Sequence, residues 1–139
     1  MQIREAVSAD VRAMLECDPY AQSSRERAQS VAASVAQRHC LIAIDGVRVL
    51  GYLVLKHDFF EQGFISLVVV SPTNRRNGVG LQLFLAAEAA CTTPKLFTST
   101  NLSNLASQKL IMKAGFRRSG IVENLDEGDP ELIYVKFLR

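Results

Sequence analysis

The sequence predicts a mixed α/β fold in a single domain, 1–139, with helices on the faces of a sheet, and three observations support it. Residues 64–70 are almost continuously apolar, as expected for a strand buried inside a sheet. Asp45-Gly46 lies between two apolar runs and suits a tight hairpin turn. Ser23 or Ser24, and later Asn104, precede stretches with helical spacing, as helix N-caps do. With 139 residues, 48% of them apolar, the chain can build one core but not two domains.

The other elements follow in chain order from caps, breakers and apolar periodicity. Ser8 can cap a first helix, which Asp18-Pro19 ends, and Gly115 ends the last helix with Phe116 as its apolar contact. We expect strands over residues 2–6, 41–44, 47–56, 64–70, 96–100, 118–123 and 132–138. We expect helices from 8 to about 17, from 23 or 24 to about 38, from 79 to about 90 and from 104 to about 114.

Charge and cysteine content exclude several classes of protein. Sixteen basic and 14 acidic residues leave a net charge of +2, without the clustered basic excess of a nucleic-acid binder. No apolar run is long enough to span a membrane, and the first residues lack the pattern of a secretory leader. Cys17, Cys40 and Cys91 form neither a metal-binding pattern nor a disulfide framework. We therefore expect a cytoplasmic protein with no metal and no nucleic-acid or membrane partner.

The segment Arg75-Arg76-Asn77-Gly78-Val79-Gly80 indicates an anion-binding site. It follows the apolar strand and opens a helix, whose first turn has unpaired N–H groups. Glycines let a phosphate approach the backbone, and two arginines add positive charge. A Walker A loop would need Gly-Lys-Ser/Thr, and a Rossmann loop would need glycine at the position of Leu83. The alternative is a solvated arginine pair in an ordinary turn.

This segment resembles the core motif of the GCN5-related N-acetyltransferases, R/Q-x-x-G-x-G/A. A second motif of that family is an asparagine that caps a helix ending in Gly-Phe, matched here by Asn104 and Gly115-Phe116. The two motifs cover residues 64–116 in the family's element order. The resemblance implies a mostly antiparallel, twisted sheet of about seven strands with about four helices, splayed between the fourth and fifth strands.

The resemblance also implies acetyl-CoA as co-substrate, bound in the gap between the splayed strands. The pantetheine arm would lie along the backbone of the fourth strand, the pyrophosphate would lie on the glycine loop, and an N–H of Val69 or Val70 would serve the oxyanion. The alternatives are core packing for the valines and turn capping for Asn101. The expected cofactor-binding residues are Val68, Val69, Val70, Arg75, Arg76, Asn77, Gly78, Val79, Gly80, Asn101 and Asn104.

The catalytic groups of the family are only partly present. The usual leaving-group acid is a tyrosine four residues before the glycine of Gly-Phe, and this chain has Ile111 there. Phe64 occupies the position at which some members carry a glutamate base. We therefore expect the base to be Glu61, at the start of the fourth strand, or Glu123, at the end of the sixth. The alternative is that both are ordinary surface carboxylates.

The acceptor site is predicted from the segment 123–131, which holds five acids and no base. In the family, the connection between the last two strands often borders the acceptor, so Asp126, Glu127 and Asp129 are expected to attract a cationic amine. Phe59 is expected to form a wall of the same pocket. The alternatives are a solvated hairpin loop for the acids and core packing for Phe59.

The sequence thus predicts an acetyl-CoA-dependent N-acetyltransferase that moves an acetyl group to a primary, cationic amine by direct transfer in a ternary complex. The acceptor would be a small-molecule amine, or the N-terminus or a lysine of a peptide, and exposed edge strands could pair two copies as a homodimer. Ile111 and Phe64 favour a second hypothesis, a CoA-binding sensor domain without turnover. A third is an interaction module that uses the acidic segment as its docking surface.

Overall fold

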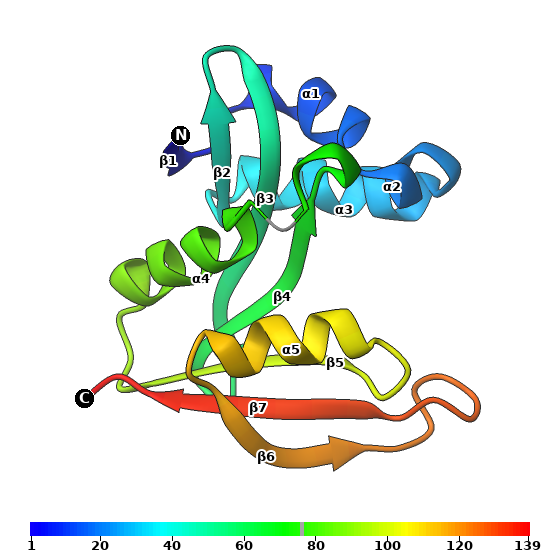
Figure 1. Ribbon diagram of the computed structural model, residues 1–139, viewed down its shortest axis with the longest axis vertical. Coiled ribbons are helices and arrows are strands. Elements are labelled where there is room, and N and C mark those ends of the chain that lie inside the picture. The colour runs from blue at the N-terminus through cyan, green and yellow to red at the C-terminus, as the bar shows by residue number, and fades with distance from the viewer. Residues whose placement is uncertain (76) are drawn as a thin grey trace.

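The computed structural model describes residues 1–75 and 77–139, which form one seven-stranded sheet in the order β1-β2-β3-β4-β5-β7-β6 (Figure 1). Neighbouring strands are antiparallel except for β4 and β5, which are parallel. The strands are β1 (Gln2–Glu5), β2 (Cys40–Asp45), β3 (Arg48–Phe59), β4 (Gln62–Val70), β5 (Lys95–Asn101), β6 (Arg117–Val122) and β7 (Glu131–Phe137). The predicted mixed, mostly antiparallel sheet is confirmed.

The helices are α1 (Val11–Glu16), α2 (Pro19–Ser23), α3 (Arg25–Ala36), α4 (Val79–Ala90) and α5 (Leu105–Lys113), with 3₁₀ turns η1 (Ser8–Asp10) and η2 (Pro72–Asn74). The first predicted helix is wrong at its start, because residues 8–10 are a 3₁₀ turn whose N-cap is Val7. Asp18-Pro19 ends α1 as expected but also starts α2. Proline at the first helical position lacks only an N–H that would be unpaired anyway, and Asp18 caps that helix by accepting from the N–H of Tyr20.

The β3–β4 hairpin is longer than predicted because its turn contains only Phe60 and Glu61. Both residues adopt positive φ, 50° and 66°, which lets a two-residue turn join the strands without glycine. In the β2–β3 hairpin the turn is Gly46-Val47, one residue later than expected, with Gly46 at φ 62°. In the β3–β4 hairpin, strand pairing therefore continues to Phe59 in β3 and restarts at Gln62 in β4.

The predicted splay occurs between β4 and β5. Within the described residues, their ladder joins only Gly63, Phe64 and Ile65 to residues 96–98, and it ends where the Thr98 hydroxyl donates to the carbonyl of Ile65 at 2.9 Å. A bulge in the β3–β4 register follows immediately and leaves Ser66 exposed. Beyond Ile65, the edge of β4 that would pair with β5 is therefore open. The two faces are still covered as predicted, because Val68 and Val70 pack on one apolar layer and Leu67 and Val69 pack on the other.

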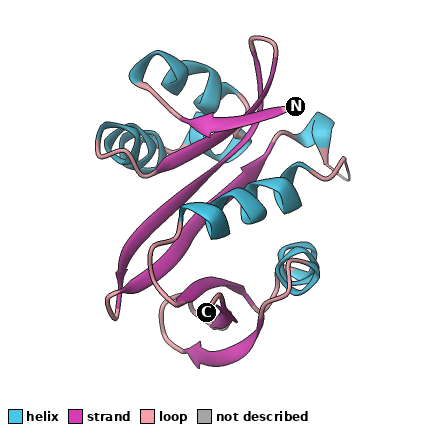
Figure 2. Cartoon of the chain, turned by 90° about the vertical axis from the view of Figure 1, so that its left-hand side faces the viewer, coloured by secondary structure: helices cyan, strands magenta, loops and turns pink. Residues whose placement is uncertain are grey.

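Helices cover the two faces of the sheet (Figure 2), and an apolar layer lies beneath them on each face. On one face, α4 and α5 pack through Leu83, Phe84 and Ile111 against the strands. On the other, α1 and α3 pack through Met14 and Val31 against the first part of the sheet. Both layers reach β4, so the open half of this strand has a helical pair on each side.

Candidate active site

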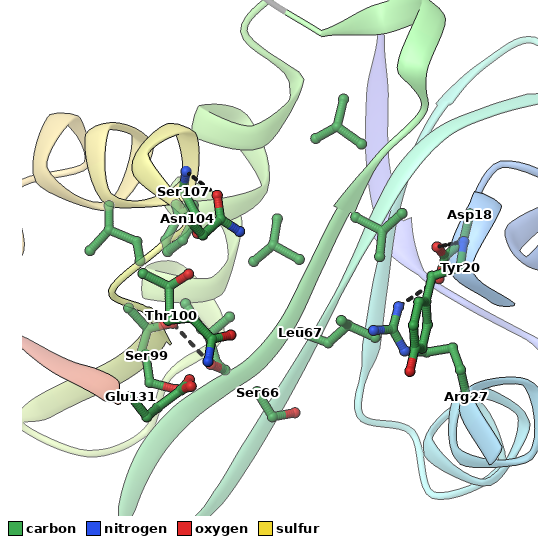
Figure 3. A pocket seen from close by; sticks show the side chains of 18 of the residues that line it. Asp18, Tyr20, Arg27, Ser66, Leu67, Ser99, Thr100, Asn104, Ser107 and Glu131 are labelled. Atoms are coloured by element: carbon green, nitrogen blue, oxygen red, sulfur yellow. Dashed lines mark hydrogen bonds and ion pairs between the residues drawn. The ribbon is translucent and has the colours of Figure 1, made fainter. Parts of the chain in front are cut away.

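A cleft of about 440 Å³ lies where β4 and β5 separate (Figure 3). Its floor is the stretch 65–70 of β4, and its opposite wall is the stretch 98–101 of β5. Asp18, Tyr20 and Arg27 lie on one side of β4, whereas Asn104, the N-cap of α5, and Ser107 in α5 lie on the other. The cleft is therefore accessible to two groups that approach the same strand from opposite faces of the sheet.

The backbone of β4 offers unpaired polar groups to this cleft. The N–H of Ser71 donates to the carbonyl of Leu50 in β3 at 2.8 Å, so the backbone groups of Ser71 face β3. Because backbone groups of a strand alternate sides, those of Val69 also face β3, and those of Val68 and Val70 face the opening. Of the three predicted valines, two are placed to bind an extended ligand through their main chain.

A second cavity, of about 730 Å³, continues from the cleft to the start of α4. The two cavities share Val68, Val70 and Arg75, so they form one continuous space. Gly78 caps the helix at φ 80° and ψ 6°, and a Cβ there would meet no atom of the described residues within 4 Å, so these residues leave the approach to the first turn open. Gly80 allows α4 to pack closely on α5, because a Cβ at this residue would come within 2.7 Å of the Leu110 side chain in α5.

The predicted cofactor-binding residues are thus mostly brought together. Arg75, Gly78, Val79, Gly80 and Asn104 line the second cavity. Asn77 is exposed and lines neither cavity, and Arg76 lies outside the described residues. Asn104 caps α5 by accepting from the N–H of Ser107 at 3.0 Å, as its sequence position predicted.

Asn101 joins the cleft to the acidic segment. It lines the cleft, and its side-chain N–H₂ donates to Asp126 at 2.9 Å and to the carbonyl of Asp129 at 3.3 Å. The carboxylate of Asp129 accepts from the hydroxyl and the N–H of Ser103 at 2.6 and 3.0 Å. These bonds tie the β6–β7 loop to the β5–α5 turn, and neither Asp126, Asp129 nor the exposed Glu127 lines the cleft.

The predicted bases and the predicted aromatic wall lie elsewhere. Glu61 is exposed in the β3–β4 turn, and Glu123 is exposed just beyond β6. Phe59 stacks on Phe64 with ring centroids 4.7 Å apart and contacts Phe97 at 5.1 Å. None of Glu61, Glu123 and Phe59 is among the residues that line the cleft.

Glu131, at the start of β7, is the carboxylate that does line the β5 side of the cleft. The hydroxyl of Ser99 donates to it at 2.6 Å (Figure 3). The pairing of β5 with β7 brings Ser99 and Glu131 together over a separation of 32 residues. In the sequence, Glu131 is only the last of five acids, and nothing local distinguishes it.

Ile111 is 1% exposed and lines the cleft where the family resemblance placed a tyrosine. A hydrocarbon cannot donate a proton. Among the described residues, the side chains that can donate in the cleft are those of Ser66, Thr98, Ser99, Thr100 and Ser107, together with Tyr20, Arg27, Arg75, Asn101 and Asn104.

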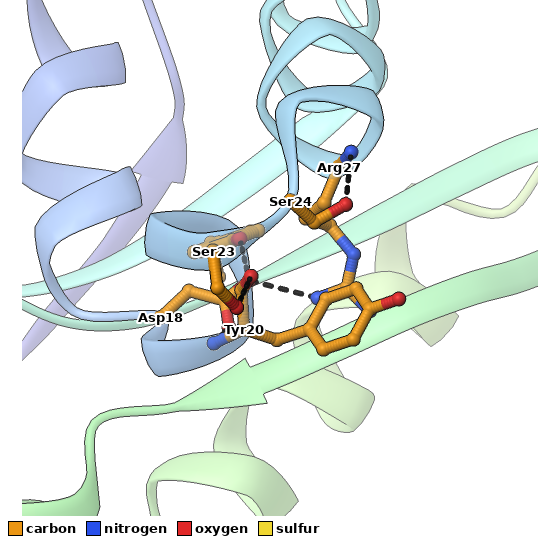
Figure 4. Close-up of polar contacts among 6 residues, drawn as sticks. Asp18, Tyr20, Ser23, Ser24 and Arg27 are labelled. Atoms are coloured by element: carbon orange, nitrogen blue, oxygen red, sulfur yellow. Dashed lines mark hydrogen bonds and ion pairs between the residues drawn. The ribbon is translucent and has the colours of Figure 1, made fainter.

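A buried carboxylate, Asp18, organises the other side of β4 (Figure 4). Asp18 is 3% exposed and accepts from the guanidinium of Arg27 and from the hydroxyl of Tyr52, both at 2.8 Å. Burial and the bond to Asp18 raise the pKa of Tyr52 far above its usual range, so its hydroxyl stays a donor. Sequence reasoning missed this cluster because Asp18-Pro19 also marks a helix boundary and Arg27 has an ordinary helical position.

The cysteines are not candidate nucleophiles. Burial raises the pKa of Cys17 to about 12 and that of Cys40 to about 11, so both remain thiols at neutral pH. Cys91 is buried against Thr93, with its sulfur 3.3 Å from the threonine hydroxyl. Within 1–75 and 77–139, no three His, Cys, Asp or Glu residues are grouped so that they could hold a metal ion. No helix among these residues is long and apolar enough to cross a membrane.

Comparison with known proteins shows which family shares this architecture. The family model described as Acetyltransferase (GNAT) family matches residues 8–116. An acetyltransferase of the GNAT family from Bacillus cereus ATCC 10987 is 36% identical, with a TM-score of 0.91 over 98% of this chain and 96% of that chain. No curated protein sequence matches the chain.

Two more distant structures share the fold. The ribosomal-protein-alanine N-acetyltransferase of Brucella melitensis is 20% identical, with a TM-score of 0.76 over 99% of both chains. The yncA protein of Salmonella typhimurium, solved with its cofactor acetyl-CoA, is 19% identical, with a TM-score of 0.77 over 99% of this chain and 94% of that chain.

Proposed function

The chain belongs to the acetyltransferase (GNAT) family, and we propose that it transfers the acetyl group of acetyl-CoA directly to a primary amine in a ternary complex. Acetyl-CoA-dependent acetyl transfer is the general activity of the family. The observation that carries the proposal is the open edge of β4 beside the glycine loop. Two unpaired backbone positions and a helix N-terminus face one continuous space there.

The cofactor would be held mainly by main-chain groups. The amides of the pantetheine arm would pair with Val68 and Val70, in the manner of an added strand. The pyrophosphate would bind the N–H groups of the first turn of α4, with Arg75 as its counter-ion. The N–H of Val68 or Val70 would also donate to the oxygen of the thioester as it becomes negative.

The reaction forms one bond and breaks another. The amine nitrogen attacks the thioester carbonyl carbon, the carbon–sulfur bond breaks, and the sulfur leaves as a thiolate that takes a proton from solvent. A thiol has an ordinary pKa of about 8.5, so this leaving group needs little help at neutral pH. The hydrocarbon at Ile111 is therefore compatible with turnover, since binding both reactants in one cleft supplies much of the rate.

The attacking amine must lose a proton, and we propose that Glu131 is the base that takes this proton. Its carboxylate lies in the cleft and is oriented by Ser99. Glu61 and Glu123, which the sequence suggested, would have to act from outside the cleft lining. A carboxylate in the cleft can take the proton directly or through one water.

The acceptor is a small-molecule amine, or the N-terminus or a lysine of a peptide. Attraction of a cationic acceptor by Asp126, Glu127 and Asp129 remains a separate proposal. Changing all three to their amides tests it: attraction predicts a higher acceptor KM and a weaker dependence of that KM on salt. If neither the acceptor KM nor its dependence on salt changes, these acids only hold the loop in place.

Two measurements test the enzyme itself. Calorimetry should detect acetyl-CoA binding, and thiol release should rise when amines of varied size and charge are added. Failure to bind acetyl-CoA would contradict the proposal outright. Binding without thiol release for any amine would favour the second candidate, a CoA-binding sensor, for which the cleft-lining Ile111 is the specific observation.

A further inference from the structure

We infer that Arg27 binds a carboxylate of the acceptor, so that the acceptor is a small amine that also carries a carboxylate group. The inference rests on the proposed function, because it names the substrate class of the same cleft. It changes the expected acceptor from a cation to a zwitterion, with its amine toward Glu131 and its carboxylate toward Arg27.

Arg27 is held in place by its neighbours. One terminal nitrogen, Nη1, donates to Asp18 at 2.8 Å, and the guanidinium carbon lies 4.5 Å from the centroid of the Tyr20 ring. Asp18 is itself fixed by Tyr52 and by the N–H of Tyr20. The guanidinium is therefore oriented before any ligand arrives, which lowers the entropic cost of binding one.

The same guanidinium has donors to spare. Its Nε and Nη2 atoms donate to no protein group among the described residues. The side chain is 25% exposed and lines the cleft, close to Leu67 of β4 (Figure 3). A planar guanidinium with two free donors is the side chain best suited to bind a carboxylate, because it can donate two parallel hydrogen bonds to the two carboxylate oxygens.

Neighbouring charge favours an anion on this side of β4. Arg27, Ser66 and Leu67 also border a shallow cavity of about 290 Å³, whose wall includes Lys56. Among the described residues that line these two cavities on this side, Asp18 is the carboxylate, and it is buried and already accepts three hydrogen bonds. Within that lining, an entering group thus meets Arg27 and Lys56 and no exposed carboxylate.

The opposite wall of the cleft supplies the complementary charge. Glu131 lies on the β5 side, so Arg27 and Glu131 bracket the open half of β4 (Figure 3). A cleft of about 440 Å³ shared with the reactive end of the cofactor leaves room for a small acceptor. A cation at one wall and an anion at the other match a molecule with one amine and one carboxylate.

The test compares acceptors that differ in one group, with acetyl-CoA saturating and thiol release as the readout. The pairs are glycine and methylamine, leucine and isoamylamine, and δ-aminovalerate and pentylamine, with cadaverine as a second cation on the same chain length. In at least one pair the carboxylate-bearing amine should have a kcat/KM about 10- to 100-fold above its partner, as for a hydrogen bond between charged groups. Equal or better turnover of every plain amine, or of cadaverine, would overturn the inference and leave the proposed function standing.

Variants of Arg27 test whether this residue recognises the carboxylate of the acceptor. Arg27→Gln should abolish the preference through a higher KM for the carboxylate-bearing amine, with the KM for acetyl-CoA unchanged. Arg25→Gln removes the same charge from an exposed position in the same helix and should change the preference less than about twofold. If Arg27→Gln proves unstable, Arg27→Lys keeps the charge without the planar fork and should retain only part of the preference. A full preference in either Arg27 variant would contradict the assignment.

Binding is measured separately from turnover. Calorimetry with CoA present should show that glycine, leucine or δ-aminovalerate binds the wild-type protein and not Arg27→Gln. If none of them binds, the inference fails. Acetyl-CoA binding and thiol release with other amines then decide the proposed function independently.

Discussion

The candidate binding sites for the two substrates are built in different ways. For the cofactor, the candidate contacts are backbone groups of Val68 and Val70 and the first turn of α4 after Gly78. For the acceptor, the candidate contacts are side chains from both sides of β4, Arg27 of α3 supported by Asp18, and Glu131 of β7 supported by Ser99.

This difference explains why the cofactor class can be inferred from the family, whereas the acceptor has to be inferred from the individual protein. A backbone site requires only glycines at fixed spacing, a strand and a helix, and its ligand class is common to a family. A side-chain site depends on residues that the fold brings together, so its specificity belongs to the individual protein. Variants in one site should therefore change the kinetics of one substrate and not of the other.

Glu131→Gln should have the largest effect. Loss of the proton acceptor is expected to lower kcat/KM for the amine by about 100-fold or more, while acetyl-CoA affinity is unchanged. Steady-state kinetics in both substrates measures this. Glu26→Gln, at an exposed position in α3, is the matched control and should behave as wild type. A comparable loss in Glu123→Gln, with activity kept in Glu131→Gln, would restore the carboxylate that the sequence suggested.

Gly78→Val should affect the cofactor site alone. A β-branched residue at φ 80° is strained by about 1–2 kcal/mol, so the loop should shift and acetyl-CoA affinity should fall about tenfold. Calorimetry measures this affinity, and the acceptor preference should persist. Gly46→Val places the same residue at φ 62° in a turn far from the cleft, and it should lower stability but not affinity. An equal loss of affinity in both variants would mean that strain acts through the whole fold.

Asp10→Asn should have the smallest effect and should touch neither substrate. Hydrogen bonds from Arg4, at 2.8 and 2.9 Å, lower the pKa of Asp10 below its value in the unfolded chain. The carboxylate therefore stabilises the fold above about pH 4, and this contribution is lost as the pH falls through the lowered pKa. Thermal melts between pH 7 and about pH 3 should show a steeper loss for wild type than for Asp10→Asn. Asp45→Asn, at the exposed end of β2, should keep the wild-type slope.

Much of the fold could be predicted from local patterns. Helix α4 lies within the predicted bounds. Asn104 begins α5, and Gly115 and Phe116 end it, as expected, because caps and glycines act over a few residues. The short α2 was missed, since one Asp-Pro pair can both end and start a helix. The open edge of β4 beyond Ile65 was not evident from its apolar composition, which does not show where a neighbouring strand diverges.

The sequence alone was enough to predict the family and the glycine loop, and the family resemblance in turn implied acetyl-CoA as co-substrate, because these motifs depend on short-range spacing and on main-chain groups that any side chain leaves in place. Only the tertiary structure decided that Glu131 meets Ser99, that Asp18 orients Arg27, and that Asp126 and Asp129 hold a loop. Each of these contacts joins residues separated in the sequence by nine positions or more. Their meeting depends on strand order, register and the bulge in β4, which no single segment encodes.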